Sequence, residues 1–366
     1  MRICIAAALM ADSRFRSIGT PRIAHELAVH LLEQGHEAFA VTDGTRISED
    51  NSRPYPIKIV GPHFSLGSLP KFASLVRDKC DLIHFHGGEQ LSYFAKLLRV
   101  FSPIPIVFTF TFIPSIFRKT MPPQTRLMLS HLSQISRRIG SKFRVDHSIA
   151  LSEFARKRLI LDEGIDPSNI SVVRYGISED YLSSTISGTE VRGLVGCTTG
   201  PSNARGFHDF LESVPLTRIK HPQARFVALA RDNLELAAFH RISPPGLEVM
   251  APRYFLNAIT PVSVVVMPFR THAAIDPPLS LLESMATGKA IVTTPIGSIP
   301  EVMDNGRGQI VSTQSPLGIA NATSQFLEND SLRNGAAEAA LDYTRKTYDW
   351  KEAISRMTTV YQRVYH

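Results

Sequence analysis

The alternation of short apolar runs with helical patterns is the feature that most constrains the fold of this chain. In residues 21–34, Ile23, Leu27 and Leu31 recur at helical spacing on one face, and Gly35 ends the pattern. Apolar runs typical of buried strands precede and follow this helix, at 2–9 and 37–42. Further runs occur at 81–86, 105–112 and 146–151. Buried runs separated by amphipathic helices predict a parallel sheet with crossover helices.

A Ser- and Gly-rich segment, 183–190, interrupts this alternation, and the pattern then starts again. We expect the second series to form strands at 193–196, 224–230, 262–269 and 290–294, with helices at 207–217 and 279–287. A length of 366 residues suffices for two domains that each bury a core. The sequence therefore predicts an α/β protein with two doubly wound parallel-sheet units joined by a polar linker.

Composition and motifs exclude several classes of protein. The three cysteines form no CxxC pair, which argues against a disulfide framework or structural zinc site and fits a reducing cytosol. Nicotinamide, flavin, P-loop and α/β-hydrolase sites have no fingerprint, because G-x-G-x-x-G, GxxxxGK[ST] and G-x-S-x-G are all absent. No apolar run approaches the roughly 18–20 residues of a membrane-spanning helix.

The amino-terminal apolar run after Arg2 has two interpretations, a signal peptide or a first buried strand. The run is short and continues at once into a strand–loop–helix pattern, so we favour the strand and expect a cytoplasmic protein.

The charge of the chain is concentrated in one segment. Between Gln90 and Val145 there is no acidic residue, while the net formal charge of the whole chain is +7. The basic residues of the segment are Lys96, Arg99, Arg118, Lys119, Arg126, Arg137, Arg138, Lys142 and Arg144. Such a segment can be a solvated basic face, or it can bind an anionic membrane, a phosphorylated acceptor or nucleic acid.

Six motifs follow one another in a specific order. They are SIGTPRIAHELAVHLLEQGHEAFAVT at 17–42, DLIHFHGG at 81–88, ALSEFARKRLILDEGIDPSNISVVRYGIS at 150–178, GLVGCTTGPSNARGFHDFLE at 193–212, PPLSLLESMATGKAIVTTPIGSIPEVM at 277–303 and YDWKEAISRMTTVYQRVY at 348–365. In this order they resemble the retaining glycosyltransferases of family 4, which have the GT-B fold. Each motif alone is weakly specific, and the resemblance depends on all six.

The resemblance implies two Rossmann-like domains that face a cleft. Residues 1–182 correspond to an acceptor-binding domain, 183–190 to the linker and 191–345 to a domain that binds a nucleotide sugar. Residues 346–366 correspond to a helix that crosses back to the first domain.

A helix that starts near Pro278 is the expected site for the donor diphosphate. The amino end of a helix offers free N–H groups and a positive dipole end to an anion. Proline has no N–H, so Leu279 and Ser280 are left as the amide donors. Glu283 matches the glutamate that binds the ribose hydroxyls in the family, a task that suits a carboxylate.

The sequence departs from the family pattern at the donor site. Ile275 stands where the family has its first glutamate, and Asp276 follows one residue late as the substitute carboxylate. Cys197 replaces a family arginine, which leaves Arg205 as the expected cation for the leaving diphosphate. Arg253, in a later loop, is a further candidate for the same site.

Three positions are expected near the sugar and the acceptor. His86, at the end of a predicted strand, matches a family histidine on the acceptor side, although it can equally be a structural histidine. Gly19 matches a glycine that lets the backbone approach the donor, although it can also be a simple turn glycine. A further family histidine is absent, and Thr111 stands there.

The resemblance thus implies a hexosyl transfer from a nucleotide-diphosphate sugar to a hydroxyl of a glycan, glycolipid or small molecule, with retention. His86, Arg205 and Asp276 are the candidate catalytic residues. We expect no metal or other cofactor, no nucleic-acid partner, and peripheral contact of 90–145 with the anionic inner membrane surface. The alternatives are a nucleotide-sugar epimerase of the same fold and a catalytically degenerate partner subunit, which the departures at Cys197, Thr111 and Ile275 suggest.

Overall fold

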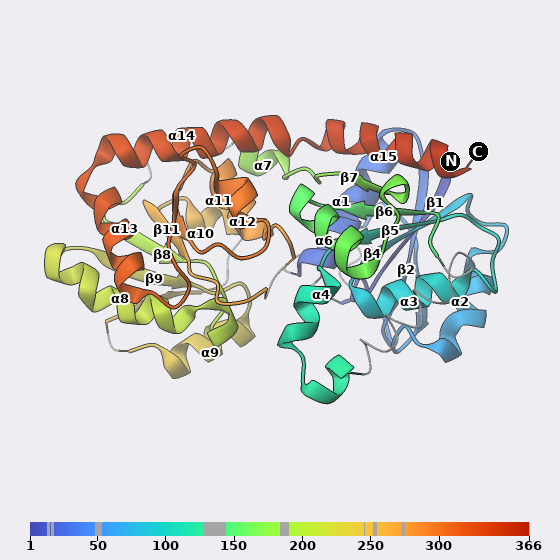
Figure 1. Ribbon diagram of the computed structural model, residues 1–366, viewed down its shortest axis with the longest axis horizontal. Coiled ribbons are helices and arrows are strands. Elements are labelled where there is room, and N and C mark those ends of the chain that lie inside the picture. The colour runs from blue at the N-terminus through green and yellow to red at the C-terminus, as the bar shows by residue number, and fades with distance from the viewer. Residues whose placement is uncertain are drawn as a thin grey trace. The chain divides into compact units, whose positions relative to one another are not determined.

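The computed structural model describes residues 1–12, 15, 18–47, 53–127, 144–183, 190–244, 246–251, 255–272 and 275–365. The chain forms two compact units (Figure 1). The first contains Met1–Tyr175, Ala274–Asp276 and Trp350–His366, and the second contains Gly176–Ala273 and Pro277–Asp349. The carboxyl-terminal helix and one short segment that precedes Pro277 therefore belong to the first unit.

A parallel sheet forms the centre of the first unit, with seven strands in the described residues and the order β3-β2-β1-β4-β5-β6-β7. Its strands are β1 (Arg2–Ala7), β2 (Glu37–Asp43), β3 (Ile57–Gly61), β4 (Leu82–Gly87), β5 (Ile106–Phe110), β6 (His147–Ala150) and β7 (Ile170–Val172). The chain winds outward from β1 in one direction and returns to β4 on its other side. This reversal makes the sheet doubly wound.

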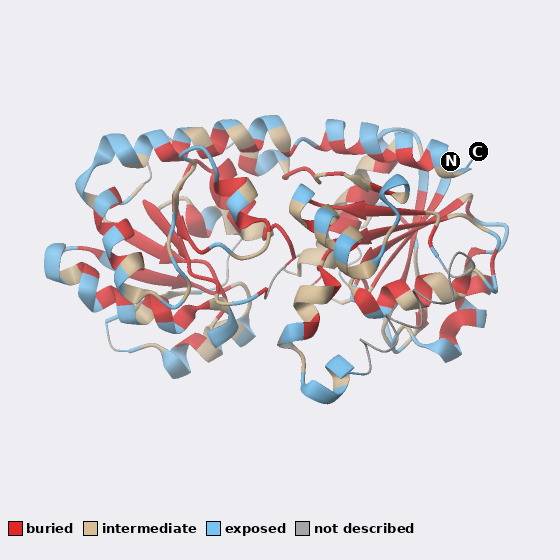
Figure 2. Cartoon of the chain, viewed as in Figure 1, coloured by how far each residue is buried: buried red, intermediate tan, exposed pale blue. Residues whose placement is uncertain are grey.

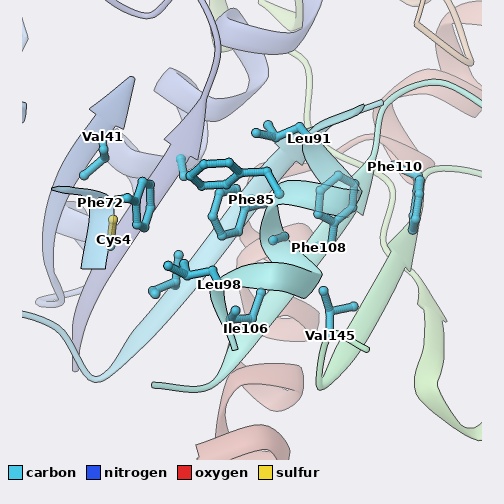
Figure 3. Packing of buried hydrophobic residues seen from close by; sticks show 14 of the residues in the cluster. Cys4, Val41, Phe72, Phe85, Leu91, Leu98, Ile106, Phe108, Phe110 and Val145 are labelled. Atoms are coloured by element: carbon cyan, nitrogen blue, oxygen red, sulfur yellow. The ribbon is translucent and has the colours of Figure 1, made fainter. Parts of the chain in front are cut away.

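Helices cover both faces of the first sheet (Figure 1). They are α1 (Gly19–Glu33), α2 (Leu69–Val76), α3 (Glu89–Leu98), α4 (Pro114–Phe117), α6 (Glu153–Glu163) and α15 (Trp350–Tyr365), with the short 3₁₀ turns η2 (Leu66–Ser68), η3 (Arg118–Thr120) and η5 (Pro167–Asn169). On one face, Phe72 and Leu98 pack on Phe85 and Phe108 of the strands (Figure 3). On the other face, α15 packs against α1 and β5.

The second unit has its own parallel sheet, with six strands in the part of the chain that the structure describes and the order β10-β9-β8-β11-β12-β13. Its strands are β8 (Leu194–Cys197), β9 (Arg225–Leu229), β10 (Glu248–Met250), β11 (Val264–Met267), β12 (Ala290–Thr293) and β13 (Gln309–Ile310). The strand order reverses between β8 and β11. In open α/β sheets, ligands bind at the carboxyl ends of the strands beside such a reversal.

The helices of the second unit also lie on both faces of its sheet. They are α7 (Glu179–Leu182), η6 (Asn203–Arg205), α8 (Phe207–Lys220), α9 (Asn233–Ile242), α10 (Phe255–Ile259), α11 (Leu279–Ala286), α12 (Ile299–Met303), α13 (Pro316–Glu328) and α14 (Asp330–Thr347). Phe210, Phe239 and Phe326 bring α8, α9 and α13 onto the strands. The central strands of both units are buried, while the outer helix faces are exposed (Figure 2).

Local sequence signals explain where the helices begin and end. Ser152 caps α6 by accepting a hydrogen bond from the amide of Ala155 at 3.0 Å, and Gly164 ends the helix with a φ of 68°. Among the described residues, no helix combines the length and the apolar character needed to cross a membrane.

Candidate functional site

The loops that follow β8 and β11 meet at the carboxyl edge of the second sheet. The amides of Arg270 and Thr271 both donate to the carbonyl of Ala204, each at 3.1 Å. Gly206 has a φ of 74°, and a Cβ added to it would overlap the carbonyl oxygen of Pro268. This close approach of two backbones requires glycine. The connected loops form the floor of a candidate anion site at the reversal of strand order.

Arg205 presents its positive charge at this edge. It lies in η6, where its amide donates to the Ser202 hydroxyl at 3.3 Å. Its guanidinium forms no hydrogen bond or ion pair with any described residue. Burial, and secondarily the positive charge of Arg231, lower the pKa of Arg205 to about 10, so the group remains charged at neutral pH. A half-buried guanidinium that is paired with no carboxylate in the described residues is suited to bind an anion.

Arg231 approaches Arg205 on the same side of Gly200. A Cβ added to Gly200 would lie 3.3 Å from Nη1 of Arg205, 3.3 Å from Nη2 of Arg231 and 2.7 Å from Oε1 of Glu235. Arg231 donates to the Glu235 carboxylate from its Nε at 3.0 Å, from its Nη2 and from its backbone amide at 3.0 Å. Three charged side chains therefore surround one point in the loop after β8.

The amino end of α11 has two amides that are free to bind a ligand. Pro278 precedes the helix with an extended ψ of 128°, and its carbonyl accepts from the amides of Leu281 and Leu282 at 3.1 and 3.3 Å. The amides of Leu279 and Ser280 have no partner among the described residues. This is the arrangement expected from the two prolines, and its use by a diphosphate stays a prediction.

Glu283 lies further along α11 and is 3% exposed. A buried carboxylate is costly unless it is hydrogen-bonded, so a group at this position has a defined polar environment. Its role with a ribose stays a prediction.

In the first unit, the segment before Pro277 packs beside the start of α1. The amide of Asp276 donates to the carbonyl of Thr111 at 3.2 Å, and the hydroxyls of Thr111 and Thr20 lie 2.9 Å apart. A Cβ added to Gly19 would lie 2.9 Å from Cγ2 of Ile275. The space above Gly19 is thus filled by the side chain of Ile275, and the departures at 275 and 111 occur at one place.

His86 belongs to a buried polar network behind this segment. Its Nδ1 lies 3.4 Å from the Tyr175 hydroxyl, which lies 2.9 Å from the Thr109 hydroxyl. Thr109 contacts His84 at 2.8 Å, and His84 contacts the Tyr361 hydroxyl on α15 at 2.7 Å. The Nε2 of His86 is buried and has no hydrogen-bond partner in the described residues. This network ties α15 to the sheet and leaves one imidazole nitrogen available.

We expect His86 to remain neutral from pH 8 to pH 5, because burial lowers its pKa to about 3. The unfolded state takes up this proton near pH 6.5, so stability is lost as the pH falls from about 6.5 toward 3, by up to ~1.4 kcal/mol per pH unit. NMR titration of the imidazole Cε1 proton, with His86→Gln to assign the signal, checks this. A midpoint above pH 5 would contradict the burial of His86.

Some of the basic residues in the acid-free segment pair with carboxylates that lie outside the segment. Arg118 is buried between Glu89 and Glu163, and Arg99 pairs with Asp146 at 3.2 Å. Glu89 and Asp146 directly flank the segment. The exposed basic residues in the described part are Lys119, Arg126 and Arg144. Arg137, Arg138 and Lys142 lie outside the described residues, so a basic surface can be assigned only to the first three.

The candidates from the sequence divide between the two units. Gly19, His86 and Asp276 lie in the first unit. The second unit contains Arg205, Pro278, Leu279, Ser280 and Glu283. Arg253 lies outside the described residues. Sequence analysis missed Arg231, because no motif contains it. The only available signal was topological, since the carboxyl ends of neighbouring parallel strands β8 and β9 place their loops side by side.

Known proteins define the class to which this architecture belongs. Anabaena HepE in complex with UDP and glucose superposes with a TM-score of 0.77 at 14% identity, covering 99% of both chains. WaaG, a glycosyltransferase involved in lipopolysaccharide biosynthesis, superposes with a TM-score of 0.71 at 14% identity, covering 98% of this chain and 99% of that one. The fold is therefore GT-B, as predicted from the sequence.

Sequence comparison places the chain in a family. Residues 18–181 match the model of Glycosyltransferase Family 4, and residues 192–329 match the model of Glycosyl transferases group 1. The chain therefore belongs to the family 4/group 1 glycosyltransferases. An uncharacterized glycosyltransferase of Methanocaldococcus jannaschii is 30% identical over 86 residues, which are 23% of this chain and 22% of that protein. The matches span between 18% and 39% of the length of the curated relatives.

Proposed function

We propose that this chain is a retaining glycosyltransferase that moves a sugar from a nucleotide-diphosphate donor to a hydroxyl of a glycan, glycolipid or small-molecule acceptor. The observation that carries this proposal is the guanidinium of Arg205, which forms no ion pair in the described residues and lies at the reversal of strand order in the second sheet. A diphosphate supplies the negative charge that this position lacks. The complex of HepE with UDP and glucose supports a donor of this class.

The proposed chemistry uses the donor diphosphate as the leaving group. As the bond to the anomeric carbon breaks, negative charge grows on the diphosphate, and Arg205 and the amides of Leu279 and Ser280 stabilise it. Glu283 binds the ribose hydroxyls. The sugar passes through an oxocarbenium-like transition state, and the acceptor hydroxyl attacks from the face that the diphosphate leaves, giving its proton to an oxygen of the departing diphosphate. We propose that this reaction needs no metal.

The first unit supplies the acceptor side in this proposal. His86 and Asp276 are its candidate polar residues, and the neutral Nε2 of His86 suits a hydrogen bond to a hydroxyl. The exposed residues Lys119, Arg126 and Arg144 suit contact with an anionic membrane that presents a lipid-linked acceptor.

The test is a screen of nucleotide sugars by thermal stabilisation, followed by transfer assays on soluble and vesicle-bound acceptors. We expect one nucleotide class to raise the melting temperature and to lose its sugar only when an acceptor is present. Product analysis by NMR then reports the anomeric configuration, and a chelator leaves the rate unchanged. Stimulation by anionic vesicles that disappears at high salt supports the membrane contact, and equal stimulation by neutral vesicles contradicts it.

Two results would replace this proposal. Consumption of the donor without an acceptor, with a change of configuration in the sugar, identifies an epimerase. Absence of binding by any nucleoside diphosphate identifies a non-catalytic subunit. The packing of Ile275 over Gly19 is the specific observation that favours this second outcome, because it fills the space expected for a donor.

A further inference from the structure

Arg231 is the charged residue at the candidate site that the proposed chemistry does not yet use. It lies two residues after the end of β9, whereas Arg205 lies in the loop after the neighbouring strand β8. Both guanidinium groups have a nitrogen 3.3 Å from the position of a Cβ on Gly200. Two like charges this close repel each other; burial is the main cause of the lowered pKa of Arg205, and the charge of Arg231 adds to it.

Glu235 only partly neutralises this pair of cations. Its carboxylate engages Nε and Nη2 of Arg231, and Nη1 of Arg231 has no partner among the described residues. The guanidinium of Arg205 has no partner there either. One carboxylate therefore faces two guanidinium groups, and one unit of positive charge is left over.

The same ion pair fixes the position of Arg231. Glu235 lies in the first turn of α9, where its amide donates to the cap residue Asp232 at 2.8 Å, and it also accepts from the backbone amide of Arg231 at 3.0 Å. The side chain is consequently held before any ligand arrives, so little conformational entropy is lost on binding.

A third polar group in the same loop lacks a partner. The hydroxyl of Thr198 is buried, in a residue that is 2% exposed, and has no hydrogen-bond partner in the described part of the chain. Thr198 stands two residues before Gly200, at the carboxyl end of β8. A buried hydroxyl without a partner, in the loop that leads from β8 to Arg205, is a second feature that a ligand at this site would explain.

We propose that Arg231 and Arg205 together form the seat of a diphosphate, with Arg205 on one phosphate and Arg231, oriented by Glu235, on the other. This inference rests on the proposed function for the identity of the ligand, a nucleoside diphosphate. Two phosphates carry the charge that two guanidinium groups can bind, whereas a monophosphate engages only one of them. Arg231 is then the residue that discriminates a diphosphate from a monophosphate.

The test compares Arg231→Gln with wild type by calorimetry. The probes are inorganic pyrophosphate, inorganic phosphate, the nucleoside diphosphate that the wild type binds most tightly, and the monophosphate of the same base. We expect Arg231→Gln to lower the affinity for both diphosphate probes on the order of ten- to a hundred-fold. The affinity for both monophosphate probes should fall by less than about threefold. Arg231→Lys retains the charge and should lose less.

Arg225→Gln is the matched control. Arg225 lies at the amino end of the same strand and pairs with Glu248 at 2.9 and 3.0 Å, so the variant removes the same charge at the opposite edge of the sheet. We expect it to leave all four affinities unchanged. Circular dichroism confirms that both variants are folded.

Two results would overturn the inference. One is a diphosphate affinity of Arg231→Gln equal to that of Arg225→Gln, and the other is an equal loss for monophosphate and diphosphate probes. Neither result affects the proposed function if the wild type still transfers sugar. A different result is that the wild-type protein binds pyrophosphate in a manner that depends on Arg231 and yet binds no nucleoside diphosphate. This result would support the site formed by Arg205 and Arg231 and would contradict the proposed function.

Discussion

The Gly206→Ala variant is expected to lose ~3 kcal/mol or more of unfolding free energy, the largest stability effect of any substitution considered for this chain. Two penalties combine at this position. Alanine is strained at a φ of 74°, and its Cβ would overlap the carbonyl oxygen of Pro268 and lie 2.6 Å from the carbonyl carbon. Both contacts are backbone atoms of a loop that Ala204 holds in place, so neither can move without breaking hydrogen bonds.

Urea unfolding followed by circular dichroism measures this loss, and Gly335→Ala is the control. Gly335 lies inside α14, and an added Cβ there has no neighbour within 4 Å. Alanine at this site should stabilise the protein by about 0.5–1 kcal/mol, because glycine costs more entropy in a helix. Equal stabilities for Gly206→Ala and wild type would show that the loops after β8 and β11 do not meet as described.

The central strands of both sheets were predictable from the sequence, and the edge strands were not. The nine apolar runs correspond to β1, β2, β4, β5, β6, β8, β9, β11 and β12. The missed strands β3, β7, β10 and β13 stand at the four sheet edges. A central strand of a parallel sheet is buried on both faces and reads as a continuous apolar run, whereas an edge strand such as Gln309–Ile310 is short and half-exposed.

The candidate site was predictable only where its residues lie in motifs. Leu279, Ser280 and Arg205 were found from the helix start and from the Arg–Gly pair. Arg231 could not be found this way, because its contact with the site depends on the pairing of β8 with β9. The pairing of the basic segment could not be predicted in full for a related reason, since Arg118 pairs with Glu89 at the border of the segment and also with Glu163, which is remote in sequence.

The Arg205→Gln variant is expected to have the largest effect on activity, a fall in kcat on the order of 10²–10³ under the proposed chemistry. The diphosphate gains charge as it leaves, so a cation at this position binds the transition state more strongly than the donor. We expect kcat and kcat/KM to fall by the same factor, with KM unchanged. Arg205→Lys keeps the charge without the planar fork and should recover part of the rate.

The control is Lys220→Gln, at the exposed carboxyl end of α8, the helix that directly follows Arg205. It removes one positive charge from the same unit without touching the edge where the strand order reverses, and its rate should equal that of wild type. An increase in KM at constant kcat in Arg205→Gln would mean that the guanidinium binds donor and transition state equally. Unchanged kcat and KM would mean that the diphosphate does not leave beside Arg205, because removing a positive charge from the leaving position would slow the reaction.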